Sequence, residues 1–115
     1  MPDSFSYPRS ARLLTPVDFK RVFKKAKKLN YREFSVYICH NDMDNPRLGL
    51  AISKKAAKKA VTRNKIKRTI RESFRLNQAR LQDWDVVFVA RPAAAQLSSE
   101  QLQQLILKIW TRIES

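Results

Sequence analysis

The sequence predicts a single α/β domain, an α+β two-layer sandwich in which helices cover a small sheet. The chain has 115 residues, which suits one domain. Hydrophobic residues make up 43% of it, enough to form one core. Apolar residues follow helical spacing in some segments and alternate or run together in others, in the order α-β-β-α-β-α. No internal repeat divides the chain.

The first helix is predicted over residues 16–26. The segment Thr15-Pro16-Val17-Asp18 is typical of a helix start, with a threonine cap, a proline at the first helical position and an acidic residue three positions after the cap. Phe19 and Phe23 are spaced i, i+4, so with Val22 they form an apolar stripe on one face. A helical aromatic pair usually packs in a core, and this alternative stays open here.

Three strands are predicted after this helix. Residues 34–40 and residues 47–53 each alternate between two faces, and the segment 41–46 between them is dense in turn residues. These two strands are therefore expected to form a hairpin. Residues 85–90 form a short apolar run that ends near Pro92, which is typical of a buried strand.

The last helix is predicted to start at Ser98 or Ser99, either of which can act as its cap. Its apolar residues recur at i, i+3, i+4 and i+7, a pattern that predicts a helix packed on the core. The stripe consists of Leu102, Leu105, Ile106, Ile109, Trp110 and Ile113.

Positive charge dominates the surface chemistry. The formal net charge is +14, and the stretch from Lys54 to Arg75 has ten basic residues against one acidic residue, Glu72. From about residue 57 to residue 76 the pattern is helical, and Ile66, Ile70 and Phe74 fall on one edge of the helix. A solvated face would intersperse acidic residues, so this face is predicted to bind phosphate. The candidate residues are Lys54, Lys55, Lys58, Lys59, Arg63, Asn64, Lys65, Lys67, Arg68, Arg71 and Arg75.

A polyanion is the expected partner, with nucleic acid first and an anionic membrane surface second. Residues 1–14 include Pro2 and Pro8 and show no apolar period, so we expect a flexible arm before a domain over 15–115. No long apolar run or signal-peptide pattern occurs, and the single Cys39 suits a reducing compartment, where we expect it to be a small buried residue. A cytoplasmic location is expected.

The sequence contains few residues that are suited to catalysis by the protein itself. The chain has one histidine, His40, whereas acid/base cleavage of RNA normally needs two groups. Asp42 and Asp44 could hold Mg²⁺, but the turn that they occupy explains both. We therefore expect no catalytic residue and no metal ligand.

Four segments of the chain resemble the bacterial ribonuclease P protein component. They are the basic motif from Ala60 to Glu72 (AVTRNKIKRTIRE), the segment from Arg12 to Phe19, the strand and lysine pair from Arg47 to Lys55, and the late strand from Asp85 to Arg91. In that family an RNA subunit cleaves the 5′ leader from precursor tRNA with Mg²⁺. The resemblance implies that this protein is an accessory subunit without a cofactor of its own, and that its partners are the catalytic RNA and precursor tRNA.

The resemblance also implies roles for particular residues. The signature on the basic helix, which lies against the catalytic RNA, falls on Arg63, Asn64 and Lys65. Lys65 stands where the family usually has arginine, so it keeps the charge but lacks a bidentate fork. A cleft for the single-stranded leader falls on Phe19, Phe23 and Tyr37. A left-handed crossover between the strands that flank the basic helix is implied as well.

Two alternative functions share the basic helix. A noncatalytic protein that binds structured RNA, of the ribosomal type, would have the same charge but no leader cleft. A DNA-binding helix-turn-helix is a weaker alternative, because no short helix and tight turn directly precede the basic helix.

Overall fold

The computed structural model describes residues 16–41, 45–81 and 83–114, with side chains in the first helix from Lys20 onward. The predicted arm, the cap at Thr15 and the pair Asp42 and Asp44 lie outside the described residues.

Within these described ranges, the sheet has four strands in the order β1-β2-β4-β3. The strands are β1 (Lys27–Asn30), β2 (Phe34–His40), β3 (Arg47–Ala51) and β4 (Trp84–Ala90). β2 pairs antiparallel with both β1 and β4, whereas β3 pairs parallel with β4. The short strand β1, with the sequence KKLN, was not predicted because Leu29 is its only apolar residue. Its lysines suit an edge strand, since charge there discourages pairing with other chains.

The predicted hairpin of residues 34–40 and 47–53 is wrong, because β4 lies between the two strands. The fully buried side chains of β4 explain its central position. Val86 and Phe88 pack into the main core on one face, and Val87 packs with Val22 on the other. A strand that is buried on both faces gains most from neighbours on both edges.

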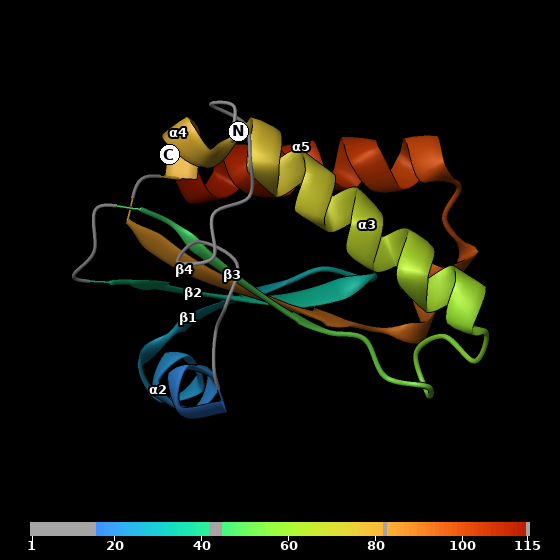
Figure 1. Cartoon of the computed structure of the whole chain (residues 1–115), viewed down its shortest axis with the longest axis horizontal. Helices are drawn as coiled ribbons and strands as arrows, with labels where there is room; N and C mark the ends of the chain where they lie inside the picture. The colour runs from blue at the N-terminus through green and yellow to red at the C-terminus, as the bar shows by residue number, and fades with distance from the viewer. Residues whose placement is uncertain (1–15, 42–44, 82, 115) are drawn as a thin grey trace, which may run out of the picture.

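Helices cover both faces of the sheet, as Figure 1 shows. The long helices α3 (Ala60–Leu76) and α5 (Ser99–Glu114) lie on one face, and α2 (Pro16–Lys25) lies on the other. Short helices, α4 (Gln78–Leu81) and η1 (Pro92–Gln96), join the larger elements. The main core lies between the sheet and the α3–α5 layer, and it includes the predicted edge of the basic helix, Ile66, Ile70 and Phe74.

The last helix confirms the predicted apolar stripe and resolves its cap. Ser98 precedes α5, its Oγ accepts the Gln101 N–H at 3.1 Å, and the Gln101 Oε1 accepts the Ser98 N–H at 2.9 Å. This reciprocal pair is a capping box, so Ser98 rather than Ser99 is the cap. The indole N–H of Trp110 donates to Ser73 Oγ at 2.7 Å, which ties α5 to α3.

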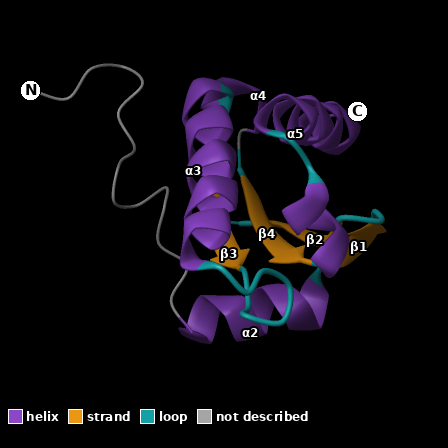
Figure 2. Ribbon diagram, turned by 90° about the vertical axis from the view of Figure 1, so that its right-hand side faces the viewer, coloured by secondary structure: helices purple, strands orange, loops and turns teal. Residues whose placement is uncertain are grey.

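The connection from β3 through α3 to β4 is left-handed. Both strands run from left to right beneath α3 in Figure 1. Figure 2, in which the front of Figure 1 lies on the left, shows that β3 lies in front of β4 in the view of Figure 1. Seen from α3 with the strands pointing up, β4 therefore lies to the left of β3. General rules strongly favour the opposite hand, so this expectation could come only from the family resemblance.

None of the helices in the described part of the chain is long and apolar enough to cross a membrane.

Candidate nucleic-acid interface

The outward face of α3 bears cations that nothing in the described part of the chain neutralises. Its buried edge points to the sheet, so Arg68 and Arg71 are exposed and Lys67 is partly exposed. Among the described residues, these three side chains make no ion pair or hydrogen bond. Their charges are therefore available to an external anion such as RNA phosphate.

Glu72, the only acidic residue of α3, neutralises one cation at the end of this face. The Arg75 Nε donates to Glu72 Oε2 at 3.1 Å, and the terminal nitrogen of Arg75 pairs with Oε1. The hydrogen bond from Arg75 lowers the pKa of Glu72 below its usual value. Arg75 is thus less available to phosphate than Arg68 or Arg71.

Two residues of the predicted signature hold α3 in place. The Arg63 guanidinium donates to the carbonyls of Ala57 and Lys58, each at 2.9 Å, and closes the loop before the helix. The Lys65 Nζ donates to the Leu97 carbonyl at 3.1 Å, so Lys65 leans toward the start of α5. Helical spacing had placed Lys65 on the outward cationic half. Asn64, between them, is exposed.

The loop before α3 extends the cationic surface. The lysines of this loop are all exposed. The Ser53 carbonyl holds the loop by accepting hydrogen bonds from the N–H groups of Ala56 and Ala57 at 3.1 and 3.0 Å. The four lysines are Lys54, Lys55, Lys58 and Lys59. We call the surface formed by these lysines with Lys67, Arg68 and Arg71 the α3 cationic face.

An aromatic pair lies on the other face of the sheet, beside α2. Phe23 is 45% exposed, and its ring meets the Tyr37 ring edge-on at 4.8 Å between centroids. The Lys28 ammonium lies 5.6 Å from the Tyr37 ring centre. The structure thus brings together two of the predicted cleft residues, while the side chain of Phe19 lies outside the described part. An exposed and a partly exposed ring beside a cation suit stacking of unpaired bases.

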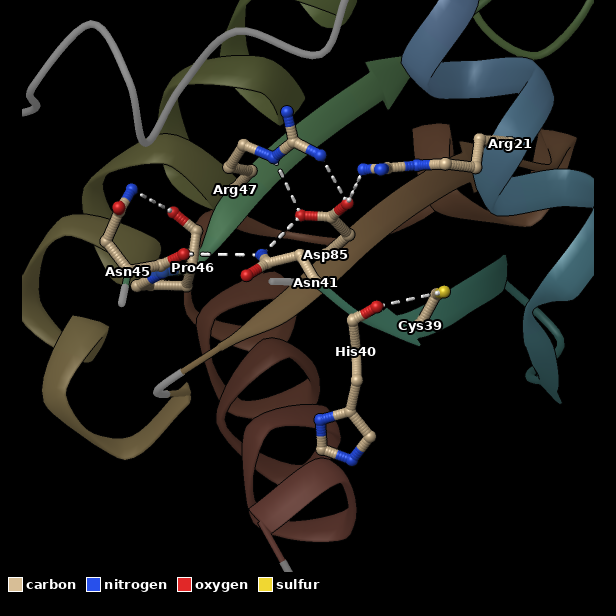
Figure 3. A network of polar contacts seen from close by, with 8 residues as sticks. All are labelled: Arg21, Cys39, His40, Asn41, Asn45, Pro46, Arg47 and Asp85. Carbon is tan, nitrogen blue, oxygen red and sulfur yellow. Dashed lines mark hydrogen bonds and ion pairs between the residues drawn. The ribbon is translucent and has the colours of Figure 1, made fainter. Parts of the chain in front are cut away.

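A buried ionic network fixes α2 over the sheet (Figure 3). Asp85 in β4 is fully buried and accepts two bonds from Arg47 in β3, at 2.9 and 2.7 Å. Its two oxygens also accept from Asn41 at 2.7 Å and from Arg21 of α2 at 3.3 Å. Since Arg21 lies two residues before Phe23, this network positions the aromatic pair. This network was not predicted from the sequence, although Arg47, a charged residue within an alternating strand, was a signal for it.

Other polar groups form no second site among the described residues. His40 Nδ1 lies 3.2 Å from Asp83 Oδ1, and its ring stacks on Trp84. Cys39 is only half-buried and its thiol donates to the His40 carbonyl at 3.3 Å, so the expectation of a buried cysteine is wrong. Cys39 is partly exposed because it shares the face of β2 that α2 covers only in part. Within the described ranges, no cluster of three or more His, Cys, Asp or Glu side chains could hold a metal ion.

Comparisons with known proteins agree on one family. A family model described as Ribonuclease P matches residues 7–114. The ribonuclease P protein component of Aliivibrio fischeri is 44% identical over 96% of this chain and 94% of its own length. That of Ectopseudomonas mendocina is 47% identical over 96% of this chain and 83% of its own length.

Solved structures give the same result. The RNase P protein of Staphylococcus aureus superposes with a TM-score of 0.80 at 37% identity, covering 90% of this chain and 97% of its own. The RNase P protein of Thermotoga maritima gives 0.78 at 33% identity, covering 90% and 98%.

Proposed function

Because this chain belongs to the ribonuclease P protein component family, which acts in tRNA processing, we propose that it is the accessory subunit of an RNA-catalysed endoribonuclease. In this proposal the α3 cationic face binds the catalytic RNA, and the Phe23–Tyr37 pair binds the 5′ leader of precursor tRNA. The RNA carries out the Mg²⁺-dependent cleavage of the leader. The protein supplies cations and stacking surfaces, and no nucleophile.

The observation that carries this proposal is the separation of two surfaces that suit RNA. The helix α3, with Lys67, Arg68 and Arg71, lies on one side of the sheet, and the aromatic pair lies on the other side beside α2, while the loop between β3 and α3 reaches toward the side of α2. Phosphate neutralisation on the first side is independent of sequence and suits a large folded RNA. Stacking on the second side needs unpaired bases, which a leader provides. One subunit can therefore contact two RNAs at once.

Stacking also suits a leader whose sequence varies. Every base has a π face, and each stacked base contributes about 1 to 3 kcal/mol. Because Phe23 is already held against Tyr37 in the unbound protein, little side-chain ordering is needed on binding.

The test is cleavage of precursor tRNA at limiting Mg²⁺ by the RNA subunit, with and without this protein. We expect the protein to increase the rate. A variant with Lys67, Arg68 and Arg71 changed to glutamine should lose the increase, whereas Lys108→Gln on the exposed side of α5 should keep it. No increase with the unaltered protein would contradict the proposal.

A second measurement separates this function from a noncatalytic structured-RNA-binding protein. In the holoenzyme, Phe23→Ala and Tyr37→Ala should weaken binding of precursor tRNA by about tenfold each, in line with one lost stack, and leave mature tRNA unaffected. A plain RNA-binding protein would lose no preference for the precursor.

A further inference from the structure

A groove lies between the end of α3 and the middle of α5, on the outer surface of the helix layer, and we call it the α3–α5 groove. Its volume is about 230 Å³ and its lining is mostly apolar. Buried Trp110 of α5 donates to Ser73 of α3 at 2.7 Å and so joins the two helices at this groove. The groove is therefore a fixed feature of the fold. Six residues line it: Glu72, Ser73, Leu76, Asn77, Gln103 and Leu107.

Two leucines leave apolar surface in this groove open to solvent. Leu76 is 53% exposed and Leu107 is 45% exposed. Among the described residues, only two other large apolar side chains are as exposed, Phe23 of the aromatic pair and Val61 near the start of α3. A single exposed apolar side chain such as Val61 is ordinary, whereas two that line one groove indicate a binding surface.

The groove itself is neutral, but cations border it. The Glu72 carboxylate pairs with Arg75, and the other lining side chains carry no charge. Arg68 lies one turn before Glu72 on the same side of α3, and Arg71 directly precedes Glu72. Both arginines are exposed, and neither has an ion pair or hydrogen bond among the described residues. Phosphate therefore belongs on these arginines, and the group that enters the groove should be uncharged.

A base is the uncharged group that RNA offers to such a groove. Pockets for drug-sized ligands begin at about 300 Å³, so this smaller groove suits one planar ring system. The two leucines can contact the faces of a base. The amide of Gln103 has no partner among the described residues and can both donate to and accept from a base edge. A second copy of this chain fits less well, because two chains of net charge +14 repel each other.

We propose that the α3–α5 groove binds one unpaired base of the RNA that lies along the α3 cationic face. This inference rests on the proposed binding of the catalytic RNA to α3, and it adds a contact with a base to the contacts with phosphate. A base that is stacked in a helix does not present its faces, so the groove selects a bulged or looped nucleotide. Such a contact fixes where along the RNA the protein binds, which phosphate contacts alone do not specify.

The first test is the affinity of the full chain for the RNA subunit over a range of salt concentrations. Leu107→Ala should weaken binding by about threefold or more, as expected when about 30 Å² of apolar contact is lost. It should leave the slope of log K against log salt unchanged, because it removes no charge. Arg71→Gln should instead lower that slope by about 0.9, the value for one phosphate contact. A circular dichroism melt of each variant shows that it is folded.

The second test is chemical probing of the base edges of the RNA subunit at protein concentrations that saturate it. We expect the unaltered protein to protect one unpaired base that Leu107→Ala leaves reactive. Val61→Ala is the matched control, since it truncates an exposed apolar side chain of α3 outside the groove. It should protect that base as the unaltered protein does.

The response of the base decides the outcome. The proposal is overturned if no base becomes reactive with folded Leu107→Ala, whether or not the affinity falls. A loss of self-association by Leu107→Ala in sedimentation, without such a base, would identify a second copy as the occupant. If Arg71→Gln still lowers the salt slope in that case, the proposed function stands; if Arg71→Gln also has no effect, binding of the RNA subunit by α3 fails as well.

Discussion

Asp85→Asn is expected to destabilise the protein strongly. Arg47, the main partner of Asp85, is 5% exposed and donates to both carboxylate oxygens. The asparagine removes the carboxylate that pairs with this buried guanidinium, and breaking a buried ion pair by removing one member typically costs about 3 to 5 kcal/mol. Urea unfolding measures it: for an m value of about 2 kcal/mol per molar, the midpoint should fall by about 2 M.

Two further variants make this prediction specific to the buried pair. Arg21→Met should cost less than about 1 kcal/mol, because the Arg21 side chain is 45% exposed and Asp85 keeps its bonds to Arg47. Adding Arg47→Met to Asp85→Asn should recover most of the loss, since it removes the buried charge that has lost the Asp85 carboxylate. A cost for Asp85→Asn as small as that for Arg21→Met, or no recovery in the double variant, would refute the reasoning.

Four other predictions concern the helices and the charge. Glu72→Gln should remove the carboxylate that neutralises Arg75, tighten binding of the RNA subunit and steepen the salt slope by up to about 0.9 in a filter-binding titration. The pKa of Glu72 is lowered in the folded state, so its contribution to stability should be fully present above its usual pKa of 4.5 and lost as the pH falls through the lower folded value. At that low pH, the urea midpoints of Glu72→Gln and of the unaltered protein should converge. Sulfate should raise the melting temperature relative to chloride at matched ionic strength by binding the native cationic face, and Arg71→Gln should reduce this effect. Ser98→Ala should cost about 1 kcal/mol in urea unfolding by removing the cap of α5.

The helices and their buried edges could be predicted because they depend on local spacing. Ile66, Ile70 and Phe74 lie on one edge of any helix with this sequence, and the core then takes that edge. Strand pairing could not be predicted in the same way. Whether residues 34–40 pair with 47–53 or with 84–90 depends on which strand has two apolar faces to bury, and the turn residues at 41–46 favoured the wrong partner.

The candidate site was predictable in charge but not in detail. The one-sided sign of residues 54–75 indicated the α3 cationic face, whereas the bonds of Arg63 and Lys65 depend on carbonyls that only the folded loops bring near. The Asp85 network likewise joins residues from four separate segments. Spacing along one element gives no information about such contacts.

The central position of β4 has a consequence for how the protein folds. Among the described strands, β3 has β4 as its only neighbour, and β2 pairs with β4 over its full length, yet β4 is the last of these strands to be synthesised. Apart from the β1–β2 hairpin, the sheet therefore cannot form from contacts close in sequence, which slows folding. Until the ribosome has released β4, the nascent chain exposes both the apolar side of β3 and the basic segment that follows it. RNA that binds this basic segment before β4 has been synthesised would therefore bind a domain that has not finished folding.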